Sequence, residues 1–170
     1  MVVTRRALLV VSAAAAMAAT VLWGAGSSSA APPVTPPVAP GVVPEADLAH
    51  HGHVSLWGDR LGIWLESANS GPWDLADATV RLRFSTPLAG RQGLPQGCLW
   101  GGSRTVLCRT GPLSADGETR RAALDLRLGT RPAEVVVRVD TVWSGGVPDH
   151  EQRNNRHEVL APATGDAYVF

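Results

Sequence analysis

The sequence predicts an all-β domain, an antiparallel β-sandwich, and two features carry this prediction. Short runs alternate between apolar and polar residues, which is the pattern of a half-buried strand. Clusters of turn-forming residues separate these runs, as in Gly101-Gly102-Ser103 and Ser144-Gly145-Gly146. We expect about seven strands and an eighth near the end, at approximately 53–58, 60–67, 78–85, 97–100, 104–109, 119–128, 133–143 and 156–161. Many short strands at this spacing are typical of a sandwich.

Four of these strands show the alternation most clearly. Their apolar faces consist of Leu61, Ile63 and Leu65; Val80, Leu82 and Phe84; Leu124, Leu126 and Leu128; and Val135, Val137 and Val139. Outside the first thirty residues, no window has the apolar stripe of a helix of useful length. The domain is therefore expected over residues 49–163, with a C-terminal tail over 164–170.

The first thirty residues have the features of an export signal. Arg5 and Arg6 precede an uncharged apolar run, and a small-residue segment ends at Ala30, which predicts cleavage before Ala31. The paired arginines leave twin-arginine export open beside the general route, and retention of the segment as an anchor is also open. Residues 31–48 are rich in proline and are expected to form a linker.

The charge balance bears on the partners. All fifteen cationic residues are arginines, the chain has fifteen acidic residues, and the formal net charge is zero. Cleavage would remove two arginines and leave the chain faintly acidic. We therefore expect no nucleic-acid partner, because such proteins need a basic face, and no membrane insertion after cleavage. A secreted or extracellular location follows from the signal, with the cell surface as one variant.

Only two cysteines are present, Cys98 and Cys108. In an exported protein they are expected to form a disulfide, although metal-binding or reactive thiols are an alternative. The Gly-Gly-Ser turn between them predicts a hairpin in which Cys98 lies opposite Cys108 and Trp100 lies opposite Val106. The bond would fix the register of two adjacent strands.

The order of motifs resembles the bacterial conserved-repeat domain of surface proteins, a family related to the cell-adhesion-related domain. The motifs are Asn69-Ser70-Gly71-Pro72, the two-cysteine hairpin, Gly111-Pro112-Leu113, and Asp149 before Asn154-Asn155. The likeness covers roughly residues 61–161, and Arg109 and Thr110 depart from the family pattern. The resemblance implies an immunoglobulin-like fold, an extracellular location and no catalysis. The family usually occurs in tandem repeats, whereas one copy is present here.

Tryptophans are the candidate binding residues. Trp64 has the opposite parity to Leu61, Ile63 and Leu65 and is expected to face outward. Trp64 and Trp73 are our candidate contacts for a sugar or a protein partner, because exposed indoles suit both. Trp57 and Trp143 are expected in the core or covering a sheet face.

Two polar groups are weaker candidates for metal ions. His51 and His53 would point the same way on an extended strand next to His50, which suits Zn²⁺ or Cu²⁺. A loop with several oxygen ligands could suit Ca²⁺, and its residues are Asp149, Glu151, Asn154 and Asn155. A polar strand start and ordinary loop hydrogen bonds are the simpler interpretations, so we predict no metal and no cofactor.

The chain lacks the motifs of common hydrolases and nucleotide-binding enzymes, and Ser144 has no nucleophile-elbow context. We therefore predict a non-catalytic structural or adhesion-type binding module whose partner is a cell-envelope protein or glycan. The alternative is a carbohydrate- or small-ligand-binding module that uses exposed tryptophans. A secreted hydrolase or its inhibitor is a third hypothesis, which depends on export alone.

Overall fold

The structure is a computed structural model that describes residues 43–170. Its nine strands are β1 (Leu48–Trp57), β2 (Arg60–Asn69), β3 (Thr79–Phe84), β4 (Cys98–Gly102), β5 (Thr105–Arg109), β6 (Arg120–Arg127), β7 (Glu134–Trp143), β8 (Arg156–Pro162) and β9 (Ala167–Val169). The described part of the chain holds no helix that could span a membrane. The expected signal peptide (1–30) and most of the expected linker (31–48) lie outside the described residues.

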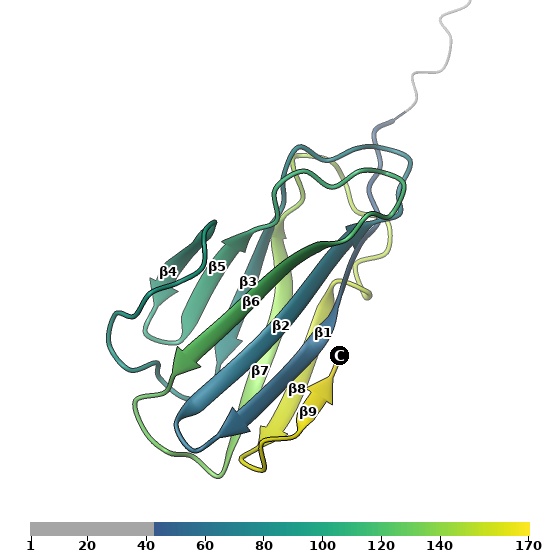
Figure 1. The fold of residues 1–170 in the computed structure, drawn as a ribbon. Helices are drawn as coiled ribbons and strands as arrows, with labels where there is room; N and C mark the ends of the chain where they lie inside the picture. Colours follow the sequence, from purple (N-terminus) through teal and green to yellow (C-terminus); the bar gives the residue numbers. More distant parts are fainter. Residues whose placement is uncertain (1–42) are drawn as a thin grey trace, which may run out of the picture. The chain divides into compact units, whose positions relative to one another are not determined.

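The strands form two antiparallel sheets that face each other (Figure 1). One sheet has four strands in the order β6-β2-β1-β9, and the other has five in the order β4-β5-β3-β7-β8. The all-β sandwich predicted from the sequence is confirmed. The eight expected strands are all present, and seven of them lie within a few residues of their expected positions. The eighth, β1, begins earlier than expected, at Leu48.

A tight hairpin fixes the register of β1 and β2 in the four-stranded sheet. β1 and β2 pair over their whole lengths, from Leu48 opposite Asn69 to Trp57 opposite Arg60. The turn between them has only two residues, and Gly58 has a φ of 63°, which suits the first position of a type II′ turn. Since side chains alternate along a strand, this register decides which side chains of β2 face the core.

The core lies between the sheets and is made of the alternating apolar side chains. Every apolar face predicted from the sequence is buried there, including Leu61, Val80, Leu124 and Val137. A second, smaller cluster lies under the loops at one end of the sandwich and consists of Ala46, Leu48, Leu75, Ala78 and Leu113. Burial of these side chains is the main force that holds the two sheets together.

Two buried polar side chains hold the loops at that end. The Asn69 side-chain oxygen accepts hydrogen bonds from the backbone N–H groups of Asp47 (3.1 Å) and Gly71 (3.2 Å). Asp77 forms an ion pair with Arg109 and accepts a hydrogen bond from the Gly111 N–H (2.9 Å). Arg109, which departs from the family pattern, therefore helps to anchor the loop that precedes β3.

The disulfide between Cys98 and Cys108 is present, as predicted. It joins directly opposed residues of β4 and β5, and Trp100 lies opposite Val106 as expected. The register shifts between Trp100 and Gly102, so the turn itself consists of Ser103 and Arg104. A side chain at Gly101 would meet Thr105 at 2.8 Å, which explains a glycine at the shift.

The final residues belong to the sandwich, whereas the sequence suggested a tail over 164–170. β9 pairs with β1 at His53, Val54 and Ser55. Phe170 and Gly52 exchange both backbone hydrogen bonds, at 3.0 and 3.2 Å. Three residues are too few to show an alternation, which is why the pattern did not reveal this strand.

Candidate functional site

Trp64 stands on the outer face of the four-stranded sheet, as the parity of β2 predicted. It is 38% exposed, while its neighbours Ile63 and Leu65 are buried. His53 of β1 lies opposite Trp64 in the register, and the two rings are nearly parallel, 8° apart with centroids separated by 6.4 Å. Two aromatic rings therefore lie next to each other on one solvent-facing surface.

The one polar atom of the Trp64 ring is already bonded within the chain. The indole N–H donates to Glu66 Oε1 at 3.2 Å, and Arg121 Nε donates to the same oxygen at 2.8 Å. These two hydrogen bonds lower the pKa of Glu66, and the bond from Trp64 has the larger effect. The carboxylate stays charged and fixes the indole, so the exposed part of the ring is its apolar surface.

A glycine lies beside the indole on the same strand. Gly62 points outward two residues before Trp64, and a side chain there would come within 2.8 Å of Ser55 Oγ. We call Trp64, His53, Gly62, Ser55 and Glu66 the Trp64 platform. An exposed aromatic face with a hydroxyl and a carboxylate at its border is an arrangement that can contact a sugar ring and its hydroxyls.

Trp73 is a second exposed indole at a separate position. It is 46% exposed and lies in the loop after β2, where its carbonyl accepts a hydrogen bond from the Asn69 side chain (2.8 Å). Trp64 lies in the middle of β2, so several residues of extended strand separate the two tryptophans. Both are accessible, although the outward position was predicted for Trp64 alone, and the structure does not bring them into one site.

Trp57 and Trp143 are also exposed, by 68% and 48%. We expected these two side chains in the core or covering a sheet face, and the core position was wrong. Each is the last residue of its strand; Trp57 has outward parity, whereas Trp143 has the parity of the buried Val139. For Trp143, the register of β7 shifts next to Thr79 and Val80, which simple alternation does not reveal. The Trp57 ring lies close to Gly165, where a side chain would meet it at 3.1 Å.

One hollow was missed by the sequence analysis. It has a volume of about 580 Å³ and lies beside the β4–β5 turn, with Trp100, Leu88, Gly101 and Ser103 among its lining residues. Its size is in the range of ligand pockets. The signal in the sequence was Trp100 directly before Gly-Gly-Ser, which we interpreted only as a hairpin turn.

The three neighbouring histidines point in two directions and do not form a metal site. His50 is fully buried and hydrogen-bonds Ser67 Oγ (3.0 Å) and Thr141 Oγ1 (2.8 Å). His51 and His53 face outward on β1. Within residues 43–170, no group of three or more His, Cys, Asp or Glu side chains is arranged to hold a metal ion.

The oxygen-rich loop uses its side chains to hold the chain together. Asp149 accepts hydrogen bonds from the Leu48 N–H (3.2 Å), the Asn155 amide (2.7 Å) and the Glu151 N–H (3.1 Å). The Asn154 amide donates to Asp47 at 2.7 Å. The Asp149 oxygens therefore hold the loop, in line with the simpler interpretation of the motif, whereas the Asn154 side-chain oxygen is buried without a hydrogen-bond partner among residues 43–170.

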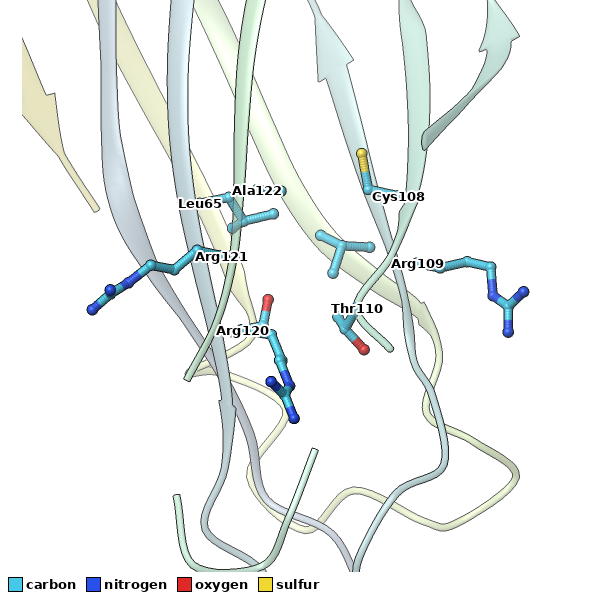
Figure 2. Close-up of a pocket in the computed structure, with 9 residues that line it drawn as sticks. Leu65, Cys108, Arg109, Thr110, Arg120, Arg121 and Ala122 are labelled. Carbon is cyan, nitrogen blue, oxygen red and sulfur yellow. The ribbon is translucent and has the colours of Figure 1, made fainter. Parts of the chain in front are cut away.

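A cleft opens between the sheets beside β6. Figure 2 shows Leu65 and Ala122 at one wall and Cys108 and Thr110 at the other, while the Arg121 and Arg109 side chains extend away from the cleft on opposite sides. Its volume is about 20 Å³, far below the roughly 300–1000 Å³ of ligand pockets. The exposed outer surfaces are therefore better candidates for binding than this cleft.

A comparison of the chain with protein-family models, with curated proteins and with solved structures finds no match. The resemblance to the conserved-repeat domain of surface proteins therefore stays a prediction from the motifs.

Proposed function

We propose that this chain is a secreted or cell-surface, non-catalytic binding module of the adhesion type. The observation that carries the proposal is the Trp64 platform, because a large apolar ring held in place on a solvent-facing sheet is a typical contact of binding surfaces. The proposed export rests on the signal pattern of residues 1–30. The motif order that resembles surface-protein repeats supports the same role.

Co-sedimentation of the full-length, oxidised chain with isolated bacterial cell envelopes tests this proposal. We expect saturable binding, and we expect Trp64→Ala to weaken it by about tenfold, the effect of losing a central aromatic contact. Trp143→Ala is the matched control, since it removes an indole of the other sheet that is at least as exposed as Trp64. Binding that is absent, or that Trp64→Ala and Trp143→Ala weaken equally, contradicts the proposal.

Carbohydrate binding is the second candidate, and the parallel rings of Trp64 and His53 beside Gly62 favour it. If the partner is a glycan, soluble glycans compete with the envelope, and titration changes the tryptophan fluorescence. Because the structure separates Trp64 from Trp73, the variants Trp64→Ala and Trp73→Ala should be measured singly. Loss of the fluorescence change in only one of them identifies the surface that binds, whereas an unchanged titration in both excludes this candidate.

A further inference from the structure

The outer face of the five-stranded sheet carries a grid of charged side chains on β3, β7 and β8. In one row, Arg81 lies opposite Asp140, which lies opposite Arg156. In the next row, Arg83 lies opposite Arg138, which lies opposite Glu158. Neighbouring strands are about 5 Å apart and the rows about 7 Å apart, so six charged side chains share one small surface. We call these six residues the arginine face.

The acidic residues of the arginine face neutralise only part of its positive charge. Asp140 is shared, because both Arg81 and Arg83 form ion pairs with it, the latter at 3.5 Å. Glu158 pairs with Arg138 at 2.5 Å. Among residues 43–170, the side chain of Arg156 hydrogen-bonds only the Gln152 side-chain oxygen, at 3.4 Å. Four arginines against two carboxylates leave an excess of two positive charges on a chain whose formal net charge is zero.

Two arginines of this face lie directly opposite each other on neighbouring strands. Arg83 and Arg138 are direct register partners, and like charges directly opposite each other destabilise a sheet. Asp140 and Glu158 lie beside this pair and offset part of the repulsion. A second opposed pair among the described residues, Arg60 and Arg127 on the other sheet, likewise has a carboxylate beside it, since Asp125 forms an ion pair with Arg60.

The arginine face is also hollowed. The side chains line an open depression of about 450 Å³, which also includes Val139 and His157. Its walls are mostly polar, so an apolar ligand would gain little there. Guanidinium groups bind carboxylates, sulfates and phosphates through paired N–H donors, and two rows of them can hold successive anionic groups of one polymer.

We propose that the arginine face binds an acidic polysaccharide, with the oxyanions of neighbouring sugar units held by Arg83, Arg138 and Arg156. The inference rests on the proposed function as a binding module and names a ligand class for it, on a surface opposite the Trp64 platform. Charge complementarity supports a polyanion, and the shallow, open shape of the depression suits an extended hydrophilic chain more than a globular partner.

Binding of the full-length, oxidised chain to polygalacturonate, dextran sulfate and neutral dextran tests this proposal. We expect binding to at least one of the two acidic polymers, no binding to neutral dextran, and weaker binding as salt rises, because salt screens these contacts. Polygalacturonate offers carboxylates and dextran sulfate offers sulfate esters, so the better ligand shows which oxyanion the face prefers.

Two double variants with the same loss of charge make the test specific. Arg83→Gln with Arg138→Gln should weaken binding by about tenfold or more, since each lost arginine removes charge-assisted hydrogen bonds. Arg60→Gln with Arg127→Gln removes an opposed pair from the other sheet and should weaken it by less than about twofold. Circular dichroism and thermal melting check that both variants are folded.

Three results would overturn the proposal: equal losses in the two double variants, no binding to either acidic polysaccharide, or tighter binding to polyglutamate than to both. The first would indicate unspecific attraction, and the last would indicate an acidic polypeptide as partner. Envelope binding without binding to acidic polysaccharides would refute this inference and leave the proposed function standing. Binding to these polymers without envelope binding would refute the proposed function and leave this inference standing.

Discussion

The two margins of the sandwich, where the edges of its sheets meet, are closed in different ways. At the β1 margin, Cα atoms of β1 come within 8 Å of β7 and β8, and those of β9 come within 8 Å of β8. At the β6 margin, β6 approaches only β2 among the described strands, and the cleft of Figure 2 opens there. Backbone proximity and polar contacts thus close the β1 margin along the strands. At the β6 margin, the end of β6 is joined to the segment after β3, where the Ala89 N–H donates to the Arg127 carbonyl at 2.8 Å.

His50 is the main polar connection at the β1 margin. Its ring lies between Ser67 of the four-stranded sheet and Thr141 of the five-stranded sheet, and its backbone N–H donates to the Asn154 carbonyl at 3.1 Å. The β6 margin has its covalent link within one sheet, in the Cys98–Cys108 bond. The two margins should therefore respond differently to substitution, to reduction and to acid.

The largest effect is expected at Gly52 of the β1 margin. A side chain there would lie 1.9 Å from the Trp64 carbonyl oxygen and 2.9 Å from the Phe170 ring. The first contact is with backbone of a paired strand, so Gly52→Ala can be accommodated only by separating β1 from β2. We expect a loss of about 3 kcal/mol or more in the free energy of unfolding, measured by chemical denaturation.

Gly93→Ala is the control for this prediction. A side chain at Gly93 meets nothing within 4 Å, so the expected change is within about 0.5 kcal/mol. Equal stability of the two variants would show that the strands at Gly52 are not as close as described.

Breaking the disulfide tests the β6 margin. The bond closes a short loop, with a sequence separation of 10, and replacing both cysteines by alanine should cost about 2–3 kcal/mol. Hydrogen exchange should rise first in β4, which is an edge strand paired only with β5. If exchange in β1 and β2 rises as much as in β4, the margins are not independent and the comparison fails.

Acid should weaken the β1 margin through His50. Burial first, and then the nearby His157 and His51, lower the pKa of His50 to about 4, while Asp140 acts in the opposite direction. The unfolded chain keeps a pKa of 6.5, so between pH 6.5 and 4 it binds more protons than the folded chain and stability falls as the pH falls. From pH 7 to pH 5 we expect a loss of about 2 kcal/mol from this group.

The matched variant is His50→Asn, which keeps a polar side chain but does not titrate. Its free energy of unfolding should change less between pH 7 and pH 5 than that of the native chain. Identical pH profiles would mean that His50 is not held neutral in the folded state.

The sequence was a better guide to the β6 margin than to the β1 margin. The alternation of apolar and polar residues identified the strands and the outward position of Trp64. Two cysteines around a turn were enough to predict the disulfide. These signals are local. The inward position of His50 depends on where β1 begins, and the need for Gly52 depends on contacts with Trp64 and Phe170, far apart in the chain. The arginine face was also hidden, because it joins residues of three strands.

The smallest effect is expected at Phe170, which closes the β1 margin from the C-terminal side. Its ring is half-buried, and its centroid lies 5.3 Å from that of the His157 ring. The ring occupies the place beside Gly52 where a side chain of residue 52 would otherwise lie. Phe170→Ala should lower the free energy of unfolding by about 1–2 kcal/mol, less than for a fully buried ring.

Phe170→Leu keeps most of the apolar contact and should cost less than about 1 kcal/mol. Thermal melting of both variants decides the point, since the backbone pairing of Phe170 with Gly52 is the same in each. If Phe170→Ala melts with the native chain, backbone pairing alone seals this margin and the ring contributes nothing. If Phe170→Leu is as damaging as Phe170→Ala, the aromatic shape rather than apolar volume is what fits between Gly52 and His157.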